Sequence, residues 1–189
     1  MSAADQTLLR KVITKLGEAP AYPDRAGPGS ILKLAAASYG FAPGADEVTM
    51  PTGFDPHAAA LFEALVESAY LVANADGEFD EGERAAFEHV VLSACAGSVA
   101  QRQVHALVDD LNDQLAEDGL EKRIKMVGRT ITKPEHAREV LRIAGLLAYA
   151  SGGVTGDERD VIERLAGEFG LERTVVDTTL AEVAHALED

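Results

Sequence analysis

Five carboxylates beside two short turns are the residues of this sequence whose types and spacing could do chemistry. Asp76, Glu78, Asp80 and Glu83 crowd one turn, and Glu158 follows a second turn of related sequence. Carboxylate oxygens are the ligands that hard cations such as Ca²⁺ and Mg²⁺ prefer, and a bound cation relieves the repulsion between crowded acids. The hypothesis that follows is a site for Ca²⁺, Mg²⁺ or Mn²⁺, with Asp76, Asp80, Glu83 and Glu158 as its metal ligands.

The same acids have a structural explanation that needs no ion. Asp80 stands three residues before Glu83, and Thr155 stands three residues before Glu158. This spacing is typical of a capping box, in which the first side chain accepts a hydrogen bond from an amide of the new helix and the acid accepts one from the amide of the cap. Capping and solvation therefore account for the acids as well, and both explanations remain open.

A regular EF-hand calcium loop is excluded by the register of the first turn. If Gly77 is the glycine of such a loop, Val72 falls on the first ligand position, where an apolar side chain cannot coordinate an ion. The helix before the turn is also expected to continue through Ala75, which would wind Asn74 away from a loop geometry. Only a degenerate cation site is compatible with this pattern.

No other group of residues has the spacing of a catalytic site. The lone Cys95 lies in an apolar helical context and is expected to be a buried, inert thiol. The histidines are scattered singly and have no spacing of zinc-ligand type. They are His57, His89, His105, His136 and His185. We therefore expect a protein that is not an enzyme.

The two turns belong to longer stretches that resemble each other. Residues 71–83 read LVANADGEFDEGE and residues 146–158 read LLAYASGGVTGDE, and an offset of 75 aligns them. The offset pairs Gly77 with Gly152 and Glu83 with Glu158, but it places Ser151 where the first copy has Asp76. This similarity indicates an internal duplication. Two halves packed around a rough twofold axis could bring Glu158 opposite Glu83.

Apolar residues recur every three or four positions along most of the chain, which is the period of amphipathic helices. No stretch shows sustained alternation with β-branched residues, so the fold class is predicted to be all-α, a compact helical bundle of two related halves. The expected helices cover 5–16, 31–39, 56–75, 81–94, the stretch from a capping box at 98–101 to 119, 120–131, the stretch from a second box at 132–135 to about 150, the stretch from 155–158 to 169, and 172–187.

The chain is expected to divide near residue 54. Residues 18–29 and 40–55 are rich in proline and glycine, which is typical of loops. They surround the short helix predicted over 31–39. We therefore predict an N-terminal arm of helices and loops over 1–54, packed outside a duplicated body over 55–189.

Composition limits the partners. The 189 residues include 32 acidic and 17 basic side chains, for a formal charge of −15. A field of this sign repels nucleic acid and anionic membranes and favours cations or a protein partner with a basic face. The N-terminus does not have the form of a signal peptide, and no apolar run reaches the ~20 residues of a membrane span. A cytoplasmic location without membrane insertion is expected.

The helix of small residues followed by Ala75, Asp76, Gly77 and a run to Glu83 resembles the tellurite-resistance TerB family. The resemblance covers residues 55–189 and leaves 1–54 unexplained. It implies a bundle of two related helical halves, each with an Asp-Gly turn followed by a glutamate. It also implies a non-catalytic cytoplasmic component of bacterial stress responses to metals or oxyanions, which binds ions or protein partners.

Two functions are therefore expected from the sequence. The first is a non-enzymatic binding or scaffold protein that uses its acidic turn for a divalent cation or for a basic partner. The alternative is a purely structural protein interaction domain, in which Asp80, Glu83 and Glu158 only cap helices and no metal is bound.

Overall fold

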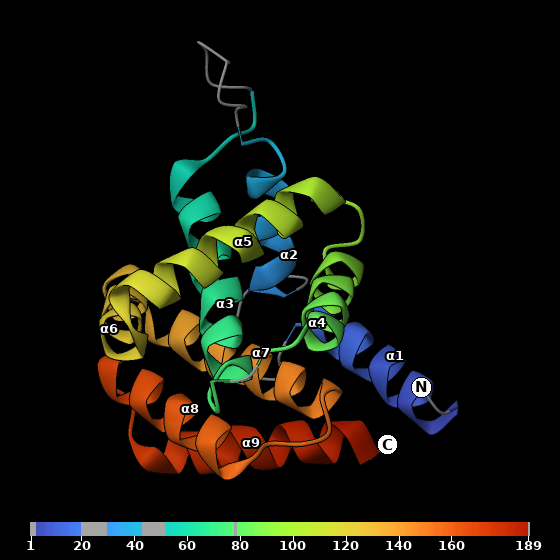
Figure 1. The fold of residues 1–189 in the computed structure, drawn as a ribbon, viewed down its shortest axis with the longest axis vertical. Helices are drawn as coiled ribbons and strands as arrows, with labels where there is room; N and C mark the ends of the chain where they lie inside the picture. Colours follow the sequence, from blue (N-terminus) through green and yellow to red (C-terminus); the bar gives the residue numbers. More distant parts are fainter. Residues whose placement is uncertain (1–2, 20–29, 43–51, 78, 189) are drawn as a thin grey trace.

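A computed structural model describes residues 3–19, 30–42, 52–77 and 79–188, and all regular structure within these ranges is α-helical (Figure 1). The all-α prediction is thereby confirmed. Nine helices occur in these ranges: α1 (Ala3–Gly17), α2 (Ile31–Tyr39), α3 (Pro56–Ala73), α4 (Glu81–Ala94), α5 (Gln101–Asp118), α6 (Leu120–Thr130), α7 (Pro134–Ala150), α8 (Gly156–Glu168) and α9 (Arg173–Glu188).

Helices α3 and α7 form the centre of the bundle. Every residue of α3 from Ala64 to Val72 is buried, and α7 is buried at Glu139, Val140 and Leu141 and again from Ile143 to Ala148. A helix that is buried on nearly all sides must be surrounded by other elements. Helices α2, α5 and α6 pack against α3, helix α9 packs against α7, and α8 contacts both (Figure 1).

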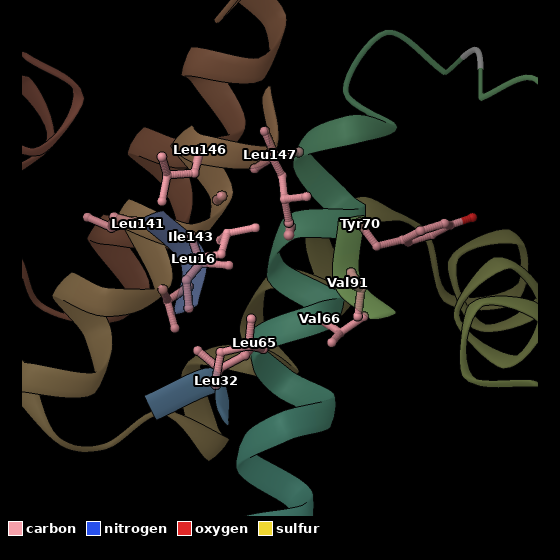
Figure 2. Packing of buried hydrophobic residues seen from close by; sticks show 14 of the residues in the cluster. Leu16, Leu32, Leu65, Val66, Tyr70, Val91, Leu141, Ile143, Leu146 and Leu147 are labelled. Atoms are coloured by element: carbon pink, nitrogen blue, oxygen red, sulfur yellow. The ribbon is translucent and has the colours of Figure 1, made fainter. Parts of the chain in front are cut away.

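The core is continuous from the first helix to the last. In Figure 2, Leu16 of α1 lies beside Ile143 of α7, Leu32 of α2 lies beside Leu65 of α3, and Val91 of α4 lies beside Val66 of α3. The side chains of Leu16 and Leu65 have no solvent exposure. Burial of a leucine of this kind contributes roughly 1.5–3 kcal/mol to folding.

Helices α1 and α2 contribute to the same core as the rest of the chain, because Val12, Leu16, Leu32 and Ala36 belong to it. Polar contacts add to this packing. Arg142 of α7 donates to the carbonyl oxygens of Lys15 and Glu18 at 2.9 and 3.3 Å, just where α1 ends. The division of the chain into an arm over 1–54 and a body over 55–189 stays a prediction, and its loop segments 20–29 and 43–51 lie outside the described residues.

Side chains cap the starts of α2 and α3. Ser30 caps α2 by accepting from the amide of Leu32 at 3.1 Å, and Asp55 caps α3 by accepting from the amide of His57 at 2.9 Å. Pro56 occupies the first turn of α3. These side chains satisfy amides that have no partner inside the helix.

Three predicted helix boundaries are wrong. The capping box at 98–101 does not form, because α5 begins only at Gln101 and its N-cap is Ala100, whose methyl side chain cannot accept a hydrogen bond. The box predicted at 132–135 is absent as well, since Lys133 precedes α7 and makes no side-chain cap. Helix α3 ends at Ala73 instead of Ala75, with Asn74 as its C-cap.

Within the described ranges, no helix combines the length and the apolar composition that crossing a bilayer requires.

Candidate functional site

A pocket of about 520 Å³ lies between the turn that joins α3 to α4 and the turn that joins α7 to α8. All four residues predicted as metal ligands line it: Asp76, Asp80 and Glu83 from the first turn and Glu158 from the second. The fold thus brings together carboxylates that are up to 82 positions apart in the chain. Glu78 lies outside the described residues.

The first turn is held by a complete capping box. Asp80 Oδ1 accepts from the amide of Glu83 at 2.8 Å, and Glu83 Oε2 accepts from the amide of Asp80 at 3.0 Å. Gly77 has a φ of 80°, which is the left-handed conformation that glycine adopts without strain. The predicted capping box is confirmed.

The second turn repeats this arrangement with different side chains. Glu158 Oε2 accepts from the amide of Thr155 at 2.7 Å, and Thr155 Oγ1 accepts from the amide of Glu158 at 3.2 Å. The predicted box is therefore confirmed here too. Thr155 and Ser151 replace Asp80 and Asp76 of the first turn, so the second wall of the pocket consists of hydroxyls and glycines beside a single carboxylate, Glu158.

The wall of the pocket between the turns is apolar. Phe79, Phe87 and Val90 contribute to it from the first half, and Leu147 contributes from α7. The rings of Phe79 and Phe87 lie edge to face with their centroids 6.0 Å apart, and both also lie edge to face with Tyr70. Burial raises the pKa of Tyr70, whose hydroxyl donates to Asn112 Oδ1 at 3.3 Å. These rings form a firm apolar surface next to the carboxylates.

The charge of the pocket has one sign. Among the described residues that line it, every ionisable side chain is a carboxylate, and none is lysine, arginine or histidine. Capping uses one oxygen each of Asp80, Glu83 and Glu158. Each of these carboxylates keeps a second oxygen that the capping box does not use.

Glu158 differs from the other buried carboxylates of the described chain. Glu67 pairs with Arg123 Nε at 2.7 Å, and Glu139 pairs with Arg142 through both of its oxygens at 2.7 and 2.8 Å. Glu158 is only 8% exposed, yet its side chain bonds to the amide of Thr155 and forms no ion pair with any described residue. It is a buried negative charge whose open side is the pocket.

The carboxylates of the pocket match a metal ion in chemistry but not in arrangement. Carboxylate oxygens are suited to Ca²⁺, Mg²⁺ or Mn²⁺. Within the described residues, however, no three acidic, histidine or cysteine side chains come close enough together to hold an ion. The four acids share a pocket without forming a coordination set, and the metal hypothesis stays a prediction.

Sequence reasoning did not assign Phe87 or Leu147 to the site. The helical spacing of both residues could have indicated their position, because residues four apart lie on one face of a helix. Phe87 is four residues after Glu83, and Leu147 is four residues before Ser151. The apolar wall could therefore have been placed beside the two turns.

Each half of the body also carries a similar ion-pair group behind its turn. Arg84 contacts Glu88 at 2.9 Å and Asp109 of α5 at 2.7 Å. At the offset of 75, Arg159 contacts Glu163 at 2.9 Å. Arg159 also contacts Asp177 of α9, but the offset does not pair Asp177 with Asp109. The arginine–glutamate contact is thus common to both turns, and the duplication and the superposition of the two halves stay predictions.

The chain was compared with known proteins. No curated protein and no solved structure matches it. A family model described as tellurite resistance protein TerB matches residues 62–180, which is more than half of the chain. The matched segment begins in α3, ends in α9 and contains every residue that lines the pocket. The chain therefore belongs to the TerB family.

Proposed function

We propose that the protein is a non-enzymatic binding protein that takes a positively charged group into the pocket between its two turns. The observation that carries this proposal is the buried carboxylate of Glu158, which lines the pocket without a cationic partner among the described residues. Buried charges in proteins are paired or bound to metals, because an unpaired ion loses its hydration without compensation. A cation that enters the pocket would supply the missing partner.

The other side chains of the pocket support the same proposal. Asp76, Asp80 and Glu83 are exposed and add negative charge at one wall. Neighbouring charges of one sign raise the local concentration of oppositely charged ligands. The exposed acids would therefore attract the ligand, which would then form an ion pair with Glu158.

A binding role is favoured over catalysis by the state of the hydroxyl groups in the pocket. Ser151 Oγ donates to the carbonyl oxygen of Ala148 at 2.8 Å, and Thr155 Oγ1 accepts from the amide of Glu158. A nucleophilic hydroxyl needs a neighbouring base to take its proton. Both hydroxyls instead bond to the backbone of their own turn.

A divalent cation is the second candidate for the ligand. It is favoured by the oxygens of Asp80, Glu83 and Glu158 that capping leaves unused. These residues and Asp76 would hold the ion, which would neutralise the clustered acids. An interaction domain whose acids only cap helices is the remaining alternative, and it binds no cation in this pocket.

The family description links relatives of this chain to tellurite resistance. We propose that the protein acts in the cytoplasm in a stress response of this kind, in contact with a protein partner that has a basic face. The formal charge of −15 supports a basic partner and disfavours nucleic acid.

The test is a thermal melt of chelator-treated protein. Ca²⁺, Mg²⁺, Mn²⁺ and short arginine- or lysine-containing peptides are added in turn. A ligand that binds the native state raises the melting temperature by mass action. We expect at least one of these cations to raise it in the wild type and not in Glu158→Gln.

Glu182→Gln is the matched control, because Glu182 is exposed on α9 and does not line the pocket. It removes the same charge from the molecule and should leave the response intact. If no cation of either class raises the melting temperature at millimolar concentration, the binding proposal fails and the interaction-domain alternative holds.

A further inference from the structure

We propose that the occupant of the pocket is the side chain of an arginine on a partner protein. This inference rests on the proposed function, because it names the chemical class of the cationic ligand. Three observations carry it: the size of the pocket, the apolar wall between the two turns, and the two phenylalanine rings on that wall.

The size and lining of the pocket fit a side chain better than a bare ion. Protein sites for organic groups have volumes of roughly 300–1,000 Å³, and this pocket has about 520 Å³. A cation held by carboxylates gains nothing from contact with Phe79, Phe87, Val90 or Leu147. A basic side chain does gain, because its aliphatic stem packs on apolar surface while its charged end contacts oxygens.

The rings favour arginine over lysine. Phe79 and Phe87 line the pocket together with Glu83. Glu83 and Phe87 lie on the same face of α4. A guanidinium group is planar, stacks on aromatic rings and donates in two directions to carboxylates. An ammonium group is compact and strongly hydrated, so it uses an aromatic wall less well.

The second turn is suited to the approach of a partner's backbone. Gly152 and Gly153 line the pocket, and a Cβ atom at either position would have no atom within 4 Å. A peptide segment can therefore pass over this turn at close range. Its arginine would reach past the glycines toward Glu158, with the acids of the first turn on the opposite wall.

The test is an NMR titration of the full chain with three peptides that differ at one position. The probes are acetyl-Gly-Gly-Arg-Gly-Gly-amide and its lysine and citrulline analogues. We expect saturable shifts for the amides of residues 75–87 and 147–158 with the arginine peptide. The lysine peptide should bind about two- to five-fold more weakly, and the uncharged citrulline peptide should not saturate.

Two pocket variants and one control variant locate the effect. Glu158→Gln should weaken binding of the arginine peptide at least about tenfold, whereas Glu182→Gln should leave it unchanged. Phe87→Leu keeps an apolar side chain in the wall and should abolish the preference for arginine over lysine. A thermal melt of each variant verifies that it is folded.

The outcomes separate this inference from the proposed function. Saturable binding of Ca²⁺, Mg²⁺ or Mn²⁺ without binding of the arginine peptide overturns the inference and leaves the cation pocket in place. Equal affinity for the arginine, lysine and citrulline peptides also overturns it. If neither metals nor peptides bind, both proposals are overturned.

Discussion

Glu158 is subject to two opposing effects. Its carboxylate lies in the first turn of α8, where the helix dipole and the amide of Thr155 favour a negative charge. Burial to 8% exposure acts in the other direction, because it removes water from the ion. The capping bond and the charge can be separated experimentally, since glutamine also serves as the acceptor of a capping box.

We predict that Glu158→Gln changes the free energy of unfolding by less than about 1 kcal/mol, because the bond to Thr155 is kept and the two charge effects oppose each other. Glu158→Ala should cost about 1–3 kcal/mol, because it leaves the Thr155 amide without its acceptor. Urea denaturation of both variants without ligand is the measurement. If Glu158→Gln lowers the free energy of unfolding as much as Glu158→Ala does, the charge itself stabilises the protein without ligand.

Arg123 provides the contrasting case of a buried charge that is already paired. It contacts Glu67 at 2.6 Å and Asp118 at 3.1 Å, and it joins α6 to α3. We predict that Arg123→Met costs about 3–5 kcal/mol, because Glu67 then remains buried without a partner. Chemical denaturation gives the value.

The double variant Glu67→Met, Arg123→Met is the control for this prediction. Apolar replacement of both members of a buried pair is often neutral, so most of the loss should be recovered. If the double variant is as unstable as the single one, loss of packing and not the isolated charge is responsible.

The sequence predicted the acids of the site but not their environments. Asp76, Asp80, Glu83 and Glu158 were identified from the repeat, because types and spacing are visible in one dimension. The burial of Glu158 and the absence of a counter-charge among the residues that the structure describes depend on the packing of α8 on α3 and α7. Such packing has no local signal in the chain.

At the scale of the helices, the two capping boxes fix where α4 and α8 begin. We predict that Asp80→Ala costs about 0.5–2 kcal/mol and that Asp80→Asn costs less, since asparagine is also a good N-cap. If capping is the only role of Asp80, Asp80→Ala lowers the free energy of unfolding by the same amount with and without a cationic ligand. Denaturation curves recorded with and without ligand provide the comparison.

A larger loss for Asp80→Ala in the presence of ligand would assign Asp80 to the binding site as well. Thr155→Ala is the matched variant in the second turn, where the cap is an uncharged hydroxyl. It should cost a similar amount, and its loss should not depend on ligand.

Helix starts could be predicted where a side chain caps them and not where none does. The caps Asp80 and Thr155 were both predicted from their spacing to Glu83 and Glu158. The start of α5 was missed because its N-cap is Ala100, whose methyl side chain gives no capping pattern in the sequence. The amide of Ala100 then donates to Gln103 Oε1 at 2.9 Å, which is half of a capping box without a capping side chain.

At the scale of the molecule, the role of the first quarter can be tested by truncation. We predict that a fragment of residues 55–189 loses at least about 5 kcal/mol of stability, because the core loses Val12, Leu16, Leu32 and Ala36. This is a large part of the roughly 5–15 kcal/mol that stabilises a typical domain. A broad or early melt recorded by circular dichroism is the expected result.

The full chain should unfold in one cooperative transition under the same conditions. A fragment that melts at the temperature of the full chain would instead support the division into an arm over 1–54 and a body over 55–189. In that case the contacts of α1 and α2 with the core would contribute little to its stability.

The contact between the first helix and the last has a consequence for the rate of folding. Lys11 of α1 donates to the carbonyl oxygen of Leu187 in α9 at 3.0 Å, across a separation of 176 residues. Contacts between such distant positions require the closure of a long loop and are expected to form late. Lys11→Met should therefore accelerate unfolding and leave the refolding rate nearly unchanged in stopped-flow experiments. Slower refolding of this variant would instead place the pairing of α1 with α9 in the folding nucleus.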